Sequence, residues 1–151
     1  MKHGFSLIEV LVFVSVLALF FVVAVAVTTA TIRNMQVSEH KIIATHYAEE
    51  LSNWITSQKE ADWYTFTNNY TSTSGKTYCF KDLSWSINRS CSGSSEMLNS
   101  FYNRYAVFTA DIAPPNTTQV TVTITVSWPE PNGTPNGTHS VQITNVYQIW
   151  E

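Results

Sequence analysis

Hydrophobic residues are concentrated near the N-terminus in one long run. Residues 10–27 read VLVFVSVLALFFVVAVAV, where Ser15 is the one polar residue. This length is close to the ~20 apolar residues that a helix needs to cross a lipid bilayer. A secretory signal peptide has only ~7–15 apolar residues before its cleavage site. Since no Gly or Pro occurs between Phe5 and Ser74, we predict that the helix continues beyond the apolar run.

A second pattern follows the apolar run and has the period of an amphipathic helix. Its apolar positions recur at intervals of three, four and seven residues, and they are Val37, Ala44, Ala48, Leu51 and Ile55, with Tyr47 and Trp54 beside them. Together the two patterns predict one helix of roughly 55 residues. The stripe ends after Lys59. Residues 61–66 then lead into the polar tract 67–76, and together they predict a loop or linker.

Alternation of apolar and polar residues marks the C-terminal half. It is strict over residues 119–128 and recurs over 140–150 and 104–112, while 78–80 and 85–88 predict two short strands. Between the last two long strands the tetrapeptide Pro-Asn-Gly-Thr occurs twice, and Asn-Gly steps favour hairpin turns. We therefore expect an α+β fold, in which a long N-terminal α-helix packs on a C-terminal antiparallel β-sheet of about four strands.

Glu9 directly precedes the apolar run and would be carried into or beside the lipid. A carboxylate at membrane depth costs a few kcal/mol, about 2.5–3.5 on insertion scales, unless it is paired. Glu9 either marks the membrane boundary or has a partner there. Lys2 is the one charged residue upstream of it, and the positive-inside tendency places the N-terminus in the cytoplasm and the chain after Val27 outside.

The residues around Glu9 carry a resemblance to a known family. Gly4 to Glu9 read G-F-S-L-I-E, which is similar to the cleavage and methylation signal of type IV prepilins. The resemblance implies that a membrane aspartyl peptidase, the prepilin peptidase, cuts after Gly4 and that Phe5 becomes the N-methylated first residue. It also implies that Glu9, as the fifth mature residue, pairs with the N-terminal amine of a neighbouring subunit during assembly.

The same resemblance implies a domain layout. Residues 1–4 are a cleaved leader, 5–27 a transmembrane and filament-core segment, 28–60 the amphipathic continuation, and 61–151 an extracellular β-rich region. Many major pilins carry a Pro in the membrane segment where this chain has Ala26. The chain therefore resembles minor pilins of the PilV type or pseudopilin I of type II secretion more than a major pilin.

The implied function is that of a structural subunit of a type IV pilus or related filament. Its expected partners are other pilin subunits, the prepilin peptidase and an inner-membrane assembly platform. Before assembly it is a single-pass membrane protein, and afterwards part of a pilus or pseudopilus. Two alternatives remain: a pseudopilin of a secretion or competence system, and a membrane-anchored binding module that never polymerises.

Two cysteines, Cys79 and Cys91, lie twelve positions apart. An even number of cysteines in an exported chain favours one disulfide, although two separate thiols are the alternative. A disulfide that closes such a loop stabilises the fold by roughly 3 kcal/mol in the chain-entropy account.

Composition and motifs disfavour several other function classes. A net charge of -3, with 8 basic and 11 acidic residues, provides no basic surface for nucleic acid as the main partner. No nucleotide-binding or hydrolase motif occurs, so we expect neither enzymatic activity nor a cofactor. His40 and His46 are six residues apart, which does not place them on one helix face, and we expect no metal site.

Overall fold

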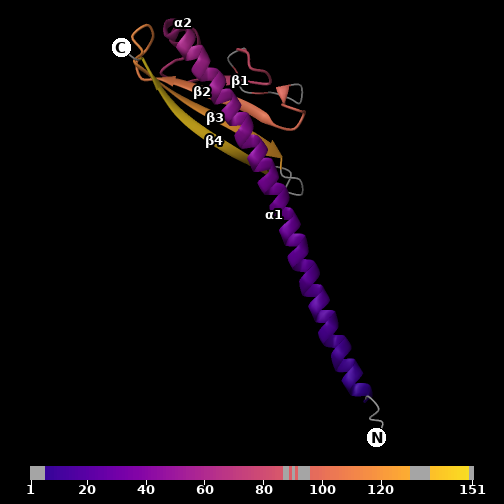
Figure 1. Cartoon of the computed structure of the whole chain (residues 1–151). Helices are drawn as coiled ribbons and strands as arrows, with labels where there is room; N and C mark the ends of the chain where they lie inside the picture. Colours follow the sequence, from indigo (N-terminus) through magenta and orange to yellow (C-terminus); the bar gives the residue numbers. More distant parts are fainter. Residues whose placement is uncertain (1–5, 87–88, 90, 92–95, 130–136, 150–151) are drawn as a thin grey trace. The chain divides into compact units, whose positions relative to one another are not determined.

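The computed structural model describes residues 6–86, 89, 91, 96–129 and 137–149. Over these residues the chain forms two helices and four strands (Figure 1), which are α1 (Leu7–Ala61), α2 (Trp63–Tyr70), β1 (Lys76–Cys79), β2 (Asn103–Ala110), β3 (Gln119–Pro129) and β4 (Thr138–Gln148). The chain divides into two compact units, Met1–His40 and Lys41–Glu151. Helix α1 thus contributes residues to both units.

In the first unit, α1 is apolar and its side chains are exposed. Large hydrophobic side chains from Leu7 to Val27 are all solvent-accessible, and the helix is long and apolar enough to cross a membrane. Its hydroxyls donate hydrogen bonds to the carbonyl four residues earlier at 2.8–2.9 Å, and these residues are Ser15, Thr28, Thr29 and Thr31. Because these polar groups are satisfied within the helix, they add little cost to a lipid environment.

The second unit is built on a four-stranded antiparallel sheet. Its strands follow one another in the order β1-β2-β3-β4, each paired with the next (Figure 1). Ala106 in β2 lies opposite Ile124 in β3, which lies opposite Ile143 in β4. The predicted α+β fold with about four antiparallel strands is confirmed, and the flanking pair Pro129 and Thr138 confirms the predicted hairpin pairing. The hairpin tip, residues 130–136, lies outside the described residues.

The core of the second unit lies between the sheet and the later part of α1. Four of the predicted stripe positions are fully buried there, and they are Ala44, Ala48, Leu51 and Ile55. Val37 belongs to the first unit and is only partly buried. From the sheet it meets the alternate positions of β2 and β3, which are Ala106, Phe108, Val120, Val122, Ile124 and Val126. Two of these helix positions are alanines, and aromatic residues such as Phe66 and Phe80 complete the core cluster.

Polar contacts also join α1 to the last strand. The Asn145 amide donates to the Ser52 hydroxyl at 2.7 Å, and the Thr56 and Tyr147 hydroxyls lie 3.3 Å apart. Buried hydroxyls and amides need such partners, because an unsatisfied buried group costs roughly 1–3 kcal/mol. The contacts therefore favour one placement of α1 along β4.

The prediction of a loop over residues 61–76 is wrong in its first part, because Trp63–Tyr70 form α2. Asp62 is the N-cap, and its carboxylate accepts a hydrogen bond from the Thr65 backbone N–H at 3.0 Å. This N-cap bond satisfies one of the exposed N–H groups at the helix start. Phe66 and Thr67 are buried, so tertiary packing holds a short helix that consists of aromatic residues, Thr and Asn.

A strand at residues 85–88 was also predicted, and the structure does not contain it at Trp85 or Ser86. Residues 87 and 88 lie outside the described part of the chain. The Trp85 ring stacks on Tyr70 with centroids 3.6 Å apart and lies 5.4 Å from Phe108. Trp85 therefore packs in the aromatic core and does not belong to a strand.

Strand β2 ends at Ala110, two residues before the predicted end, because Asp111 organises the turn that follows. Its carboxylate accepts hydrogen bonds from the backbone N–H groups of Ile112 at 2.7 Å and Thr118 at 3.2 Å. The Thr118 hydroxyl and these backbone bonds lower the pKa of Asp111 from 3.8 to about 2. Hydrogen bonding to the charged form causes such a shift.

The stability that Asp111 contributes depends on pH in a defined direction. Because its pKa is lower in the folded chain, the contribution is present above about pH 3.8 and is lost as the pH falls through about 2. We expect Asp111→Asn to lower the melting temperature at pH 6 and to lower it much less near pH 2, where part of the Asp111 carboxylate is already protonated. Thermal unfolding followed between pH 2 and 6 tests this, with the exposed Asp82→Asn as the charge-matched control. An equal loss for Asp111→Asn at both ends of the range would contradict it.

Candidate functional site

The start of α1 is the first candidate region. The Ser6 carbonyl accepts hydrogen bonds from the backbone N–H groups of Glu9 at 3.0 Å and Val10 at 3.3 Å. Glu9 therefore lies in the first helical turn. A negative charge there is favoured by the helix dipole, because the unsatisfied N–H groups make this end partly positive.

Glu9 is the one charged residue from Leu7 to Ile32. Its neighbours Leu7 and Ile8 are 78% and 70% exposed, and among the described residues no side chain forms an ion pair or side-chain hydrogen bond with the Glu9 carboxylate. An ionised carboxylate that enters an apolar environment needs an opposite charge. If this helix is covered by lipid or by other helices, the partner must come from elsewhere.

Gly4 and Phe5 lie outside the described residues. Cleavage after Gly4, methylation of Phe5 and the assembly role of Glu9 therefore remain predictions from the sequence. The structure adds the position of Glu9 in the first turn and the exposure of the helix that follows.

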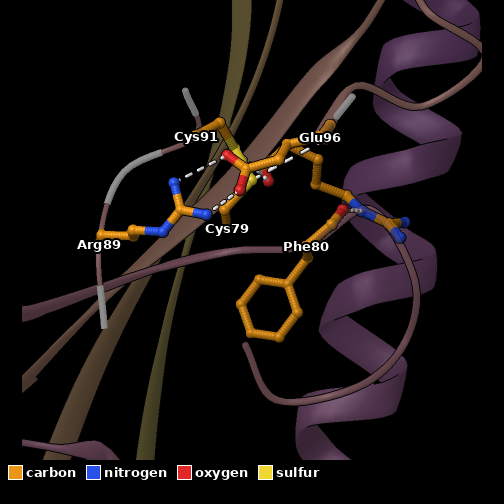
Figure 2. Close-up of a disulfide and its surroundings, with 6 residues drawn as sticks. Cys79, Phe80, Arg89, Cys91 and Glu96 are labelled. Atoms are coloured by element: carbon orange, nitrogen blue, oxygen red, sulfur yellow. Dashed lines mark hydrogen bonds and ion pairs between the residues drawn. A yellow bond between two sulfur atoms is a disulfide. The ribbon is translucent and has the colours of Figure 1, made fainter. Parts of the chain in front are cut away.

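The second candidate region is the disulfide, and it is confirmed. Cys79, the last residue of β1, is bonded to Cys91 with the Cα atoms 4.9 Å apart (Figure 2). The bond attaches the segment after β1 to the edge of the sheet. Beside it, the guanidinium of Arg89 forms an ion pair with the Glu96 carboxylate (Figure 2), so a covalent and an ionic link hold the same loop.

A buried arginine near the disulfide was missed by the sequence reasoning. The Arg104 side chain is 1% exposed, and its guanidinium donates to the Phe80 carbonyl at 3.0 Å and the Tyr47 carbonyl at 3.1 Å. It also lies 2.6 Å from a carboxylate oxygen of Glu50. One side chain therefore connects β2, the segment after β1 and helix α1.

A signal for this residue was present in the strand pattern. Arg104 lies on the same face of β2 as Ala106, Phe108 and Ala110, because alternate residues of a strand point to the same side, and this face is buried. A strand that starts its inward face with a charged residue predicts a buried ion pair, because a buried charge without a partner is strongly unfavourable. The partners were not predictable, since Glu50 lies 54 positions away on the helix.

The described residues contain no group of three His, Cys, Asp or Glu side chains placed to hold a metal ion. A hollow of about 130 Å³ beside the disulfide is lined by both basic and acidic residues, among them Lys81, Asp82, Arg89 and Glu96. No known protein family, curated protein or solved structure matched this chain in the three comparisons made.

The two ion pairs of the second unit should contribute very differently to stability. We expect Arg104→Met to lower the free energy of unfolding by about 1–3 kcal/mol, because the Phe80 carbonyl loses its Arg104 donor. The Tyr47 carbonyl keeps its bond within α1, and the Glu50 side chain, which is 41% exposed, stays solvated. Arg89→Met is the matched control, since the Arg89 side chain is 46% exposed and surface pairs contribute about 0–1 kcal/mol. Urea unfolding of the full chain in detergent, followed by tryptophan fluorescence, measures both. Equal losses would refute this ranking.

Proposed function

We propose that this chain is a structural subunit, of the minor pilin type, in a type IV pilus or related filament. It is made as a membrane-inserted precursor, cut after Gly4, methylated at Phe5 and assembled through the apolar part of α1. The N-terminus is cytoplasmic before assembly, and the second unit is extracytoplasmic. The observation that carries the proposal is an apolar helix with exposed side chains that begins with a single carboxylate in its first turn.

The exposed apolar surface of residues 7–27 suits two environments, first the lipid bilayer and then the interior of a filament. Apolar surface in water costs about 25 cal/mol per Å², so a helix exposed in this way needs cover from outside the chain. Lipid provides that cover for the precursor. The same helices packed together provide it in a filament. The internally bonded hydroxyls of Ser15 in this segment, and of Thr28, Thr29 and Thr31 just after it, suit both surroundings.

Glu9 supports assembly more than anchoring. A simple anchor gains nothing from a carboxylate next to its apolar run, because the group raises the cost of insertion. Cleavage after Gly4 would create a cationic amine on Phe5, and this amine and the Glu9 carboxylate of a neighbouring subunit would compensate each other. The pairing gives the helix an electrostatic reason to associate with other copies.

The disulfide and the composition of the chain support export. A disulfide is typical of oxidising compartments outside the cytoplasm. Only 13% of the residues are charged, about half of the usual ~25%. Helix α1 also runs through Ala26 without a break, which favours a minor pilin or a pseudopilin over a major pilin with a proline in this region.

Cleavage after Gly4 separates the pilin proposals from a non-polymerising anchored module. The peptidase needs a residue without a side chain at the scissile bond, so we expect Gly4→Leu to retain Met1–Gly4 and to abolish filament incorporation. The parent chain should lose these four residues and carry one methyl group on Phe5, as measured by intact mass spectrometry of the membrane fraction. A parent chain that keeps Met1–Gly4 would defeat both pilin readings.

Glu9 tests assembly separately from processing. We expect Glu9→Ala to be cut normally but to be depleted by at least about tenfold from sheared filaments, the equivalent of roughly 1.4 kcal/mol of lost pairing. Glu39→Ala is the matched control, because it removes the same charge from an exposed position of the same helix. Immunoblots of sheared and membrane fractions provide the measurement. Normal incorporation of Glu9→Ala would refute the pairing.

A further inference from the structure

Strand β4 forms one edge of the sheet and is long. It has eleven residues, whereas β1 at the opposite edge has four (Figure 1). Strand β3 pairs with one side of β4, and the other side pairs with no strand among those the structure describes. The outward backbone groups of an edge strand are a template for another strand.

The features that usually protect a long edge strand are absent from the sequence of β4. Residues 138–148 contain no Lys, Arg, Asp, Glu or Pro, which are the residues that block edge pairing. Val146 is 54% exposed on the outer face. On the helix-facing side Val141 and Ile143 are only partly buried, because no neighbouring strand covers them at the edge.

We propose that the outer edge of β4 is a docking surface for a second copy of this chain, paired antiparallel around a two-fold axis at Gln142. In this register Gln142 lies opposite the same residue of the other copy. Val141 then lies opposite Ile143, and Ser140 lies opposite Thr144. The two sheets become one continuous antiparallel sheet, so that the backbone groups along this edge are satisfied.

The hydrophobic pattern selects this register. In an antiparallel pair, residues directly opposite each other point to the same side of the sheet. A two-fold axis between two copies of β4 must therefore place one residue opposite its own equivalent, and this residue marks the axis. With the axis at Gln142, both edge aliphatic residues face an aliphatic residue. With the axis at Ile143, the aliphatic Val141 faces the polar Asn145. With the axis at Thr144, the aliphatic Ile143 faces Asn145.

The neutral charge of this edge supports a second copy as its occupant. A symmetric pair places each residue near its own equivalent, so a charged strand would repel itself, and β4 carries no Lys, Arg, Asp or Glu. In the pair, the parts of α1 that belong to the second unit lie on one face and run in opposite directions. This antiparallel contact is distinct from the parallel helix packing that a filament core requires.

A charge-swap experiment on the full chain in detergent micelles tests the contact. Gln142 is exposed, so Gln142→Lys and Gln142→Glu should fold normally. Each variant alone places like charges directly opposite, which is destabilising, and should weaken self-association about tenfold in sedimentation equilibrium. An equimolar mixture should associate at least as well as the parent. Thr144→Lys, opposite Ser140, is the matched control and should have a smaller effect.

Thiol cross-linking tests the register. The chain has no free cysteine, so Gln142→Cys should form an interchain disulfide with itself. Thr144→Cys alone and Ser140→Cys alone should not, because equivalent residues are then about 13 Å apart along the strands. Mixed copies of these two variants should cross-link. A monomeric parent would overturn the proposal. Self-association that is unchanged in Gln142→Lys would also overturn it, and the apolar helix would then be the contact.

Discussion

The guanidinium of Arg104 joins three parts of the second unit that the chain brings together from distant positions. It reaches the Phe80 carbonyl after β1, the Tyr47 carbonyl on α1 and the Glu50 carboxylate. A buried arginine is costly unless its donors and its charge are satisfied, so the helix, β1 and β2 must take these relative positions together. The disulfide at Cys79, next to Phe80, holds the adjoining loop to the same place.

Around this contact, the chain buries one apolar surface, and two other surfaces stay uncovered within the described residues. The later part of α1 is covered by the sheet and by an aromatic core that includes Phe66, Trp85 and Phe108. Residues 7–27 and the outer edge of β4 have no cover within the described chain. They differ in kind, because the helix offers apolar area with one carboxylate at Glu9, whereas the strand edge offers directional backbone hydrogen bonds.

Several elements were predictable because their patterns have a single structural period. The helix stripe at Ala44, Ala48, Leu51 and Ile55 and the alternation in β3 confirm this. Prediction failed where a short segment takes its conformation from contacts distant in sequence. Helix α2 needs burial of Phe66 as well as its Asp62 cap, and Trp85 joins an aromatic stack and not a strand.

The sequence by itself determined the long helix, the antiparallel strands and the Gly4–Glu9 motif, because these depend on local periodicity and on residues adjacent in the chain. It also predicted the pairing of Cys79 with Cys91, since the chain has only two cysteines. Only the tertiary structure decided the partners of Arg104, the formation of α2 and the position of β4 at the sheet edge. Those features depend on which distant segments meet, and the free energy that selects such contacts comes from packing the whole unit.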